Sequence, residues 1–168
     1  PKDAPLAVRV FEALCDRSPE HPWSLTIIGT GSALAGLAEQ IEALPEVLRS
    51  RIHREGSRSP AEVADALASS GVLLMTTIPG YEGFPRVLVE GLAAGLPAVV
   101  TEGTDTGGLI RDGENGYVRG RDPDDLAHAV IAVMGLNRET VSLSVSHLDG
   151  SVLVPKLFAA SDGAGSRS

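Results

Sequence analysis

Residues 24–41 read SLTIIGTGSALAGLAEQI, and this stretch decides the fold. Residues 23–28 form a short and mostly apolar run, which is typical of a buried strand. Gly29 and Gly31 then predict a tight turn, and apolar residues at helical spacing predict a helix over residues 33–44. A strand, a glycine turn and a helix in this order form the first part of a βαβ unit.

The same alternation of strands and helices continues on both sides of this stretch. Leu6, Val10, Phe11 and Leu14 recur at helical spacing, and Pro19 ends this helix because the residue before proline avoids the helical conformation. The capping box of Ser59 and Glu62, and Asp122 followed by Pro123, mark two further helix starts. Further strands are expected at residues 51–54, 72–76, 98–101 and 116–118, and further helices at residues 60–69, 86–94 and 122–134.

These elements predict an α/β fold, a Rossmann-like three-layer domain in which helices cover both faces of a parallel sheet. The domain is expected over residues 1–136. Residues 137–160 are expected to form a C-terminal packing segment, and the Gly/Ser-rich residues 161–168 a disordered tail.

Composition excludes several classes of protein. A length of 168 residues suits one α/β domain and is too short for two. The net charge of −8 argues against a broad nucleic-acid-binding face, because phosphate backbones are bound by clustered Lys and Arg. The single Cys15 can form no internal disulfide and is expected to be a small buried residue in a reducing compartment.

Neither a membrane span nor a metal site is indicated. No apolar run approaches the roughly 18 residues that a spanning helix needs. The four histidines lack the paired spacing of metal ligands. We therefore expect a cytoplasmic protein with no transmembrane segment, and its Arg-rich, Lys-poor composition favours a bacterial source.

Ligands of such folds bind at the carboxyl ends of the strands, and two glutamates mark one of these ends. Glu82 precedes a helix start and Glu90 lies about one and a half turns inside that helix. The free N–H groups near Gly83 and Phe84 form a seat for a phosphate, whereas Pro85 has no N–H to offer. The carboxylates would then accept hydrogen bonds from sugar hydroxyls. Alternatively, Glu82 only complements the helix dipole and Glu90 is an exposed helix residue.

The stretch at residues 81–100, YEGFPRVLVEGLAAGLPAVV, resembles the donor-site region of family 4 glycosyltransferases of the GT-B fold. That family carries two glutamates eight positions apart, an apolar helix, AAG-P and a strand. Residues 24–41 and 112–130 resemble other segments of the same family, so the likeness covers roughly residues 3–135. It implies that this chain is the C-terminal, donor-binding half of a GT-B enzyme and that an N-terminal acceptor domain is missing.

The resemblance assigns roles to residues by position. It implies that Glu82 contacts hydroxyls of the donor sugar, that Glu90 contacts the ribose and that backbone amides of Gly83 and Phe84 hold the sugar or diphosphate. Lys2 matches a lysine that neutralises the diphosphate together with an arginine, which would precede Pro1.

Two further segments would border the nucleotide. Gly29 and Gly31 would form a turn beside the cleft, and because the third position of a dinucleotide fingerprint is Leu34 here, a nicotinamide cofactor is not expected. The loop that begins at Arg54 would lie near the base. At residues 107–110, Gly-Gly-Leu-Ile departs from the family pattern by lacking its glutamate.

The expected activity is retaining transfer of a hexose from a UDP-, GDP- or similar nucleotide sugar to an unknown acceptor, without a cofactor or metal. The isolated domain is expected to be inactive, and the full-length protein to lie in the cytoplasm or peripherally at the inner membrane. Two alternatives remain: a non-catalytic α/β binding or interaction module, and a related sugar-nucleotide epimerase.

Overall fold

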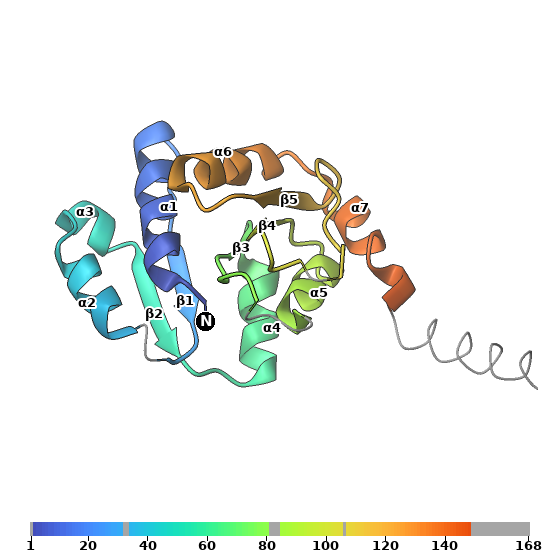
Figure 1. Ribbon diagram of the computed structural model, residues 1–168, viewed down its shortest axis with the longest axis horizontal. Coiled ribbons are helices and arrows are strands. Elements are labelled where there is room, and N and C mark those ends of the chain that lie inside the picture. Colours follow the sequence, from blue (N-terminus) through green and yellow to red (C-terminus); the bar gives the residue numbers. More distant parts are fainter. Residues whose placement is uncertain (1, 32–33, 81–84, 106, 149–168) are drawn as a thin grey trace, which may run out of the picture.

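The computed structural model describes residues 2–31, 34–80, 85–105 and 107–148 (Figure 1). The helices are α1 (Ala4–Arg17), α2 (Leu34–Glu42), α3 (Glu46–Arg49), α4 (Pro60–Ser69), α5 (Arg86–Ala93), α6 (Pro123–Val133), α7 (Arg138–Leu143) and the 3-10 turn η1 (Ser146–Leu148). The strands are β1 (Leu25–Ile28), β2 (Ile52–Gly56), β3 (Leu73–Met75), β4 (Ala98–Thr101) and β5 (Gly116–Arg119).

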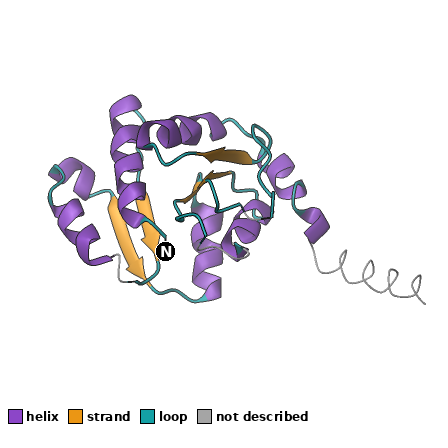
Figure 2. Cartoon of the chain, in the orientation of Figure 1, coloured by secondary structure: helices purple, strands orange, loops and turns teal. Residues whose placement is uncertain are grey.

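The strands confirm the predicted α/β class, because every pairing between them is parallel. They form two sheets rather than one, with the orders β1-β2 and β3-β4-β5 (Figure 2). In the described part of the chain, β1 has no partner on the side that faces β3, and β3 has none on the side that faces β1. The sheet is therefore interrupted between β1 and β3.

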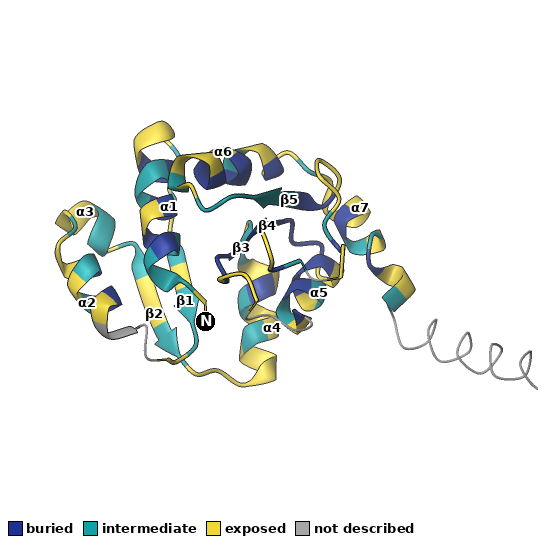
Figure 3. Ribbon diagram, in the orientation of Figure 1, coloured by how far each residue is buried: buried dark blue, intermediate teal, exposed yellow. Residues whose placement is uncertain are grey.

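Helices cover the larger sheet on both faces, as the sequence predicts (Figure 3). On one face, α1 and α6 pack together and enclose Val99 of β4. On the other face, α5 and α7 enclose Ala98 and Val100. All four residues of β4 are buried, which is typical of a strand with neighbours on both sides and helices above and below.

Local capping explains several helix boundaries. At the start of α4, the Ser59 hydroxyl accepts the Glu62 N–H while the Glu62 carboxylate accepts the Ser59 N–H, which confirms the predicted capping box. The Asp122 carboxylate accepts the Asp125 N–H at the start of α6, as also expected. Helix α1 is capped by Asp3, which the sequence did not single out.

Some elements differ from the prediction. Strand β2 continues to Gly56 instead of ending at Arg54, so Arg54 lies inside a strand and not in a loop. Helix α7 follows Asn137, whose side chain caps it, and it packs on α5. Residues 149–168, with the expected tail and much of the expected packing segment, lie outside the described residues.

Cys15 is buried in α1, as expected, and burial raises the pKa of its thiol. Among the helices that the structure describes, none is long and apolar enough to cross a membrane.

The close approach of β5 to β4 gives a test of the fold. A Cβ added at Gly116 would lie 2.1 Å from the Ala98 carbonyl oxygen, whereas a Cβ at Gly120 would meet nothing within 4 Å. We expect Gly116→Ala to lower the free energy of unfolding by about 2–4 kcal/mol, because backbone atoms must move apart. Gly120→Ala is the matched control and should change it little; equal urea midpoints for the two variants would contradict the described β4–β5 pairing.

Candidate functional site

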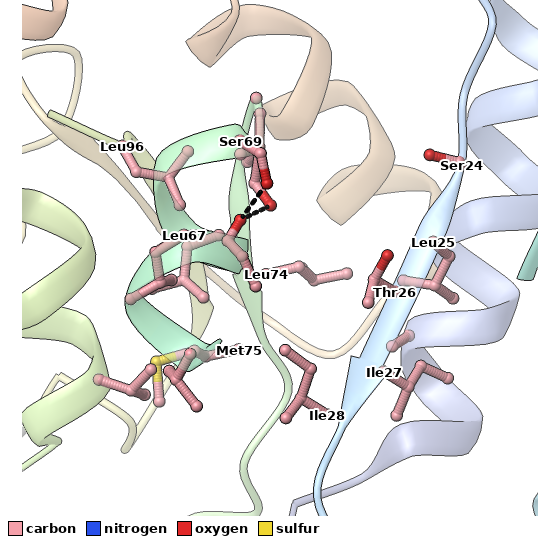
Figure 4. A pocket seen from close by; sticks show the side chains of 18 of the residues that line it. Ser24, Leu25, Thr26, Ile27, Ile28, Leu67, Ser69, Leu74, Met75 and Leu96 are labelled. Carbon is pink, nitrogen blue, oxygen red and sulfur yellow. Dashed lines mark hydrogen bonds between the residues drawn. The ribbon is translucent and has the colours of Figure 1, made fainter. Parts of the chain in front are cut away.

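A cavity of about 1150 Å³ lies between β1 and β3 (Figure 4). Apolar side chains line most of its length, including Ile28 of β1 and Leu74 of β3. Charged residues also line it, among them Lys2, Arg86 and Glu90. Lys2 lies beside the loop that follows β3, and Arg86 begins the helix after that loop. These residues therefore mark the carboxyl end of the strands, where ligands of doubly wound folds bind.

The start of α5 is open. Its N-cap, Pro85, is buried and provides no side-chain hydrogen bond, and no acidic residue lies in the first turn. The first backbone hydrogen bond runs from the Leu88 N–H to the Pro85 carbonyl at 2.9 Å, so the N–H groups of Arg86 and Val87 precede the helical ladder. In contrast, α1, α4 and α6 are all capped by side-chain oxygens. Within the described residues, therefore, no side-chain oxygen caps the positive end of the α5 dipole, the kind of helix end that favours anions.

Glu90 is exposed and lines the cavity, whereas Leu88, Gly91 and Leu92 of the same helix are buried. It lies four residues after Arg86, so the two side chains share one helix face. Within the described residues, Glu90 takes part in no ion pair closer than 4.0 Å. Glu90 thus lies where a ligand in the cavity could reach its carboxylate.

Lys2 is placed by its neighbours in the chain. It forms an isolated bridge with Thr77, and the Asp3 N–H donates to the Thr76 carbonyl at 3.2 Å. The Lys2 side chain is exposed and lines the same cavity as Arg86. The structure therefore brings two cations and the open start of α5 to one cavity.

A hydrogen-bonded junction holds the loop after β3. The Thr101 hydroxyl donates to the Thr77 carbonyl at 2.7 Å, and Arg121 Nη1 donates to the same carbonyl at 3.1 Å. Arg121 also pairs with the Asp3 carboxylate, and the Thr76 hydroxyl donates to the Asp3 carbonyl at 2.7 Å. We call these five residues the β3 junction. It fixes the chain that leads toward residues 81–84.

The remaining predicted site residues are less uniformly placed. Gly29 has φ 129°, a conformation that favours glycine, and its N–H donates to the Gly56 carbonyl at 2.6 Å. Gly31 is exposed. Arg54 is exposed in β2 opposite Ile27 and does not line the cavity, although its neighbour Glu55 does. The other three predicted site residues, Glu82, Gly83 and Phe84, lie outside the described residues.

The loop after β4 is ordered by side-chain oxygens that the sequence did not single out. The Asp105 carboxylate accepts the N–H groups of Leu109 and Ile110 at 2.7 and 2.8 Å. Buried Asn115 donates to the Leu109 carbonyl at 2.9 Å. Asp105 therefore holds the glycine-containing loop at the position where the predicted family motif lacks its glutamate.

Asp112 follows this loop. Burial opposes its ionisation, but hydrogen bonds from the Arg119 side chain and the Val118 N–H outweigh burial and lower the pKa of the carboxyl. It therefore anchors β5 to the preceding turn. In the segments that the structure describes, no three His, Cys, Asp or Glu side chains gather where they could hold a metal ion.

These features define a Rossmann-like α/β domain with a cavity that reaches the carboxyl ends of its strands, where Lys2, Arg86 and Glu90 line it. Residues 1–135 match the family described as glycosyl transferases group 1, and the chain belongs to this family. It is a GT-B glycosyltransferase domain, as the sequence resemblance implies.

Two sequence relatives and one solved structure illustrate the relationship. An exopolysaccharide phosphotransferase of Streptomyces coelicolor is 34% identical over 130 residues, which are 74% of this chain and 13% of that protein. The amylovoran biosynthesis glycosyltransferase AmsD of Erwinia amylovora is 36% identical over 101 residues, 57% of this chain and 25% of that protein. This chain thus corresponds to a quarter or less of each relative's length.

The pneumococcal O-GlcNAc transferase GtfA, solved in complex with UDP and GlcNAc, has a similar fold. The TM-score is 0.77 at 18% identity, over 99% of this chain and 34% of that one. Identity this low establishes the shared fold alone.

The β3 junction makes a testable contribution to the site. In Arg121→Ala, the Thr77 carbonyl and the Asp3 carboxylate lose a cationic partner, so we expect the free energy of unfolding to fall by about 1–3 kcal/mol. Hydrogen exchange of residues 76–80 should rise more than that of β4. Arg111→Ala is the control, because among the described residues the Arg111 side chain makes an exposed ion pair with Glu114 at 3.6 Å. If both variants unfold and exchange alike, Arg121 does not hold this loop.

Proposed function

We propose that this chain binds the nucleoside-diphosphate sugar donor of a glycosyltransferase that retains anomeric configuration and transfers a hexose. One observation carries the proposal: the start of α5, which no side chain of the described residues caps, lies at a cavity that Lys2, Arg86 and Glu90 line. The family supplies the class of reaction. The described geometry supports donor binding, because it places a helix start and charged side chains at one cavity.

The diphosphate is the group that best suits the start of α5. Free N–H groups and the positive end of a helix dipole favour phosphate oxygens, and Lys2 and Arg86 add positive charge nearby. As the bond from the sugar to the diphosphate breaks, negative charge grows on the leaving group. Groups already aimed at that charge stabilise the transition state without reorganising. This chemistry needs no metal ion and no cofactor.

Glu90 is proposed to accept hydrogen bonds from the ribose hydroxyls. It lies one helical turn beyond Arg86, so a diphosphate at the helix start leaves the attached ribose within its reach. Glu82 is proposed to contact the donor-sugar hydroxyls, with Gly83, Phe84 and Pro85 next to it in the chain. Gly29 and Gly31 would border the cleft at the end of β1, and the chain from Arg54 onward would approach the base.

UDP is the nucleotide to test first, because GtfA binds UDP on the same fold. GDP and other nucleotides are the comparison. We place the full-length protein in the cytoplasm, peripherally at the inner membrane, where an exopolysaccharide-type acceptor would be reached. The buried, unpaired Cys15 agrees with a reducing compartment.

A second candidate is a non-catalytic sugar-nucleotide-binding module within a larger enzyme. The Streptomyces coelicolor relative favours it, because that protein is named a phosphotransferase and matches this chain over only 13% of its own length. A module would bind donor without transferring the sugar even in the full-length protein. The full-length protein therefore distinguishes the two candidates.

Removing the Glu90 carboxylate tests the ribose assignment. We expect Glu90→Ala to weaken binding of UDP-sugar about tenfold, because the ribose diol loses a hydrogen-bond acceptor worth about 1.4 kcal/mol. Calorimetric titration of UDP-glucose and UDP-GlcNAc measures it. Glu39→Ala, at an exposed position of α2, is the matched control. Unchanged affinity in Glu90→Ala would remove Glu90 from the donor site.

Nucleotides of decreasing charge test the phosphate seat. Affinity should fall in the order UDP, UMP, uridine. Arg86→Ala should weaken the binding of UDP much more than the binding of uridine, because only phosphates use the start of α5. Equal binding of UDP and uridine would contradict the proposed seat.

Catalysis is expected only with the acceptor-binding part of the full-length protein. Residues 1–168 should bind donor weakly and release no transferred sugar, since the acceptor would not be held near the anomeric carbon. Product analysis of this chain and of the full-length protein, with the same donor, checks this. Turnover by residues 1–168 alone would contradict it.

A further inference from the structure

Asp3 is bonded through its backbone and through both oxygens of its carboxylate. Its N–H donates to the Thr76 carbonyl at 3.2 Å, and its own carbonyl accepts the Thr76 hydroxyl at 2.7 Å. One carboxylate oxygen accepts the Leu6 N–H at 3.0 Å and so caps α1, while the other pairs with Arg121 Nη2. The residue that starts α1 is therefore fixed both to the end of β3 and to the segment before α6.

Arg121 holds two parts of the chain at once. Its Nη1 donates to the Thr77 carbonyl at 3.1 Å while Nη2 pairs with Asp3. The side chains of Arg121 and Asp3 are 32% and 22% exposed, so solvent screens this pair less than a pair at the open surface. A guanidinium presents its donors in a rigid fork, which sets the direction between its two partners as well as their distance.

Lys2 directly precedes this fixed residue. Its side chain is exposed and lines the cavity, as Arg86 does, whereas Asp3 and Arg121, both among the described residues, do not line it. Adjacent Cα atoms are about 3.8 Å apart, so any displacement of Asp3 passes almost fully to Lys2. A lysine side chain is flexible, and the range of its ammonium depends on where its backbone is held. Asp3 and Arg121 can therefore influence a ligand in the cavity through Lys2.

A second ion pair links α1 to α6 and serves as a comparison. Arg17, in the last turn of α1, pairs with Asp124 of α6 at 2.8 Å. These side chains are 44% and 66% exposed, and pairs this exposed contribute little to stability. Arg17 also lies at the opposite end of α1 from Lys2. Removing this pair therefore disturbs a contact between the same two helices without disturbing Lys2.

We propose that Asp3 and Arg121 are positioning residues for sugar transfer, because their ion pair holds the backbone of Lys2 where its ammonium meets the diphosphate at the start of α5. This role rests on the proposed function, in which Lys2 lies beside the donor diphosphate. A cation already in place stabilises the negative charge that grows on the leaving group without reorganising. Displacing that cation costs more in the transition state than in the bound donor, so the loss falls on kcat rather than on KM.

Kinetics of the full-length protein measure this contribution. Arg121→Gln should lower kcat for sugar transfer about tenfold and change KM for the donor by less than about threefold. Asp3→Asn should act in the same way, because asparagine still caps α1 but carries no charge for Arg121. Arg121→Lys keeps the charge and should recover part of the lost kcat. Arg17→Gln is the control and should leave kcat unchanged; an equal loss in Arg17→Gln and Arg121→Gln would overturn the proposal.

Combining substitutions tests whether Arg121 acts through Lys2. Lys2→Ala alone should lower kcat at least about 100-fold, since the cation itself is lost. In the Lys2→Ala background, Arg121→Gln should lower kcat by less than about twofold further, because no ammonium remains to be positioned. If the two losses multiply, or if Lys2→Ala leaves kcat unchanged, Arg121 does not act through Lys2 and the proposal is wrong.

A loss of folded protein would also lower kcat, so stability is measured on the same samples. Asp3→Asn is the milder variant because α1 keeps its cap. At a temperature where circular dichroism shows each variant fully folded, kcat of Arg121→Gln and Asp3→Asn should still be about tenfold below that of the unsubstituted protein. Recovery of full kcat at that temperature would show that the pair only stabilises the fold.

Nucleotide binding separates failure of the positioning role from failure of the proposed function. Calorimetric titration with UDP should give affinities within about threefold for the unsubstituted protein and for Arg121→Gln, because the start of α5 and Arg86 remain. If UDP binds to both and kcat of Arg121→Gln is unchanged, the positioning role fails and the donor site stands. If the unsubstituted protein binds no UDP, GDP or other nucleotide, the donor site fails and the positioning role fails with it.

Discussion

The carboxyl end of β3 is held by hydrogen bonds from three distant parts of the chain. Thr101, at the end of β4, and Arg121, before α6, both donate to the Thr77 carbonyl, and Asp3, before α1, bonds to Thr76. Asp3 and Arg121 lie in connections, and Thr101 is the last residue of β4. Because buried backbone carbonyls need partners, this junction allows the loop after β3 to leave the sheet at a defined place. The site at the start of α5 depends on that place.

Local signals in the sequence predicted those elements whose ends are determined locally. The capping box at Ser59 and the Asp122 cap both lie within one turn of the helices they start, so they could be recognised by spacing alone. Helix α3 was missed because its four residues are too few for a periodic pattern. The end of β2 was placed two residues early because Arg54 and Glu55 are polar, yet pairing with β1 continues to Gly56.

The sequence indicated the candidate residue that lies on a single helix. It did not indicate the contacts that several elements form together. Glu90 could be recognised because it interrupts an apolar pattern, and the structure places it on the cavity side of α5. Arg121 lies 118 residues from its partner Asp3, a separation that no local spacing reveals. In the sequence it is only one of several charged residues around the predicted start of α6. Its role depends on the tertiary fold that joins α1 to β3.

The division of the domain and the location of the site have a common origin. In a doubly wound sheet, the cleft lies where the strand order changes direction, because adjacent connections there run to opposite sides. In this domain the order reverses between β1 and β3, because β2 lies beyond β1 on one side and β4 and β5 follow β3 on the other. Lys2 and Thr77 meet at this point of reversal. The open start of α5 follows from the next connection, so the cations and the free N–H groups are brought together by strand order. The same reasoning explains why Arg54, in the outer strand β2, is farther from the cavity than sequence spacing suggested: β1 lies between β2 and the cavity.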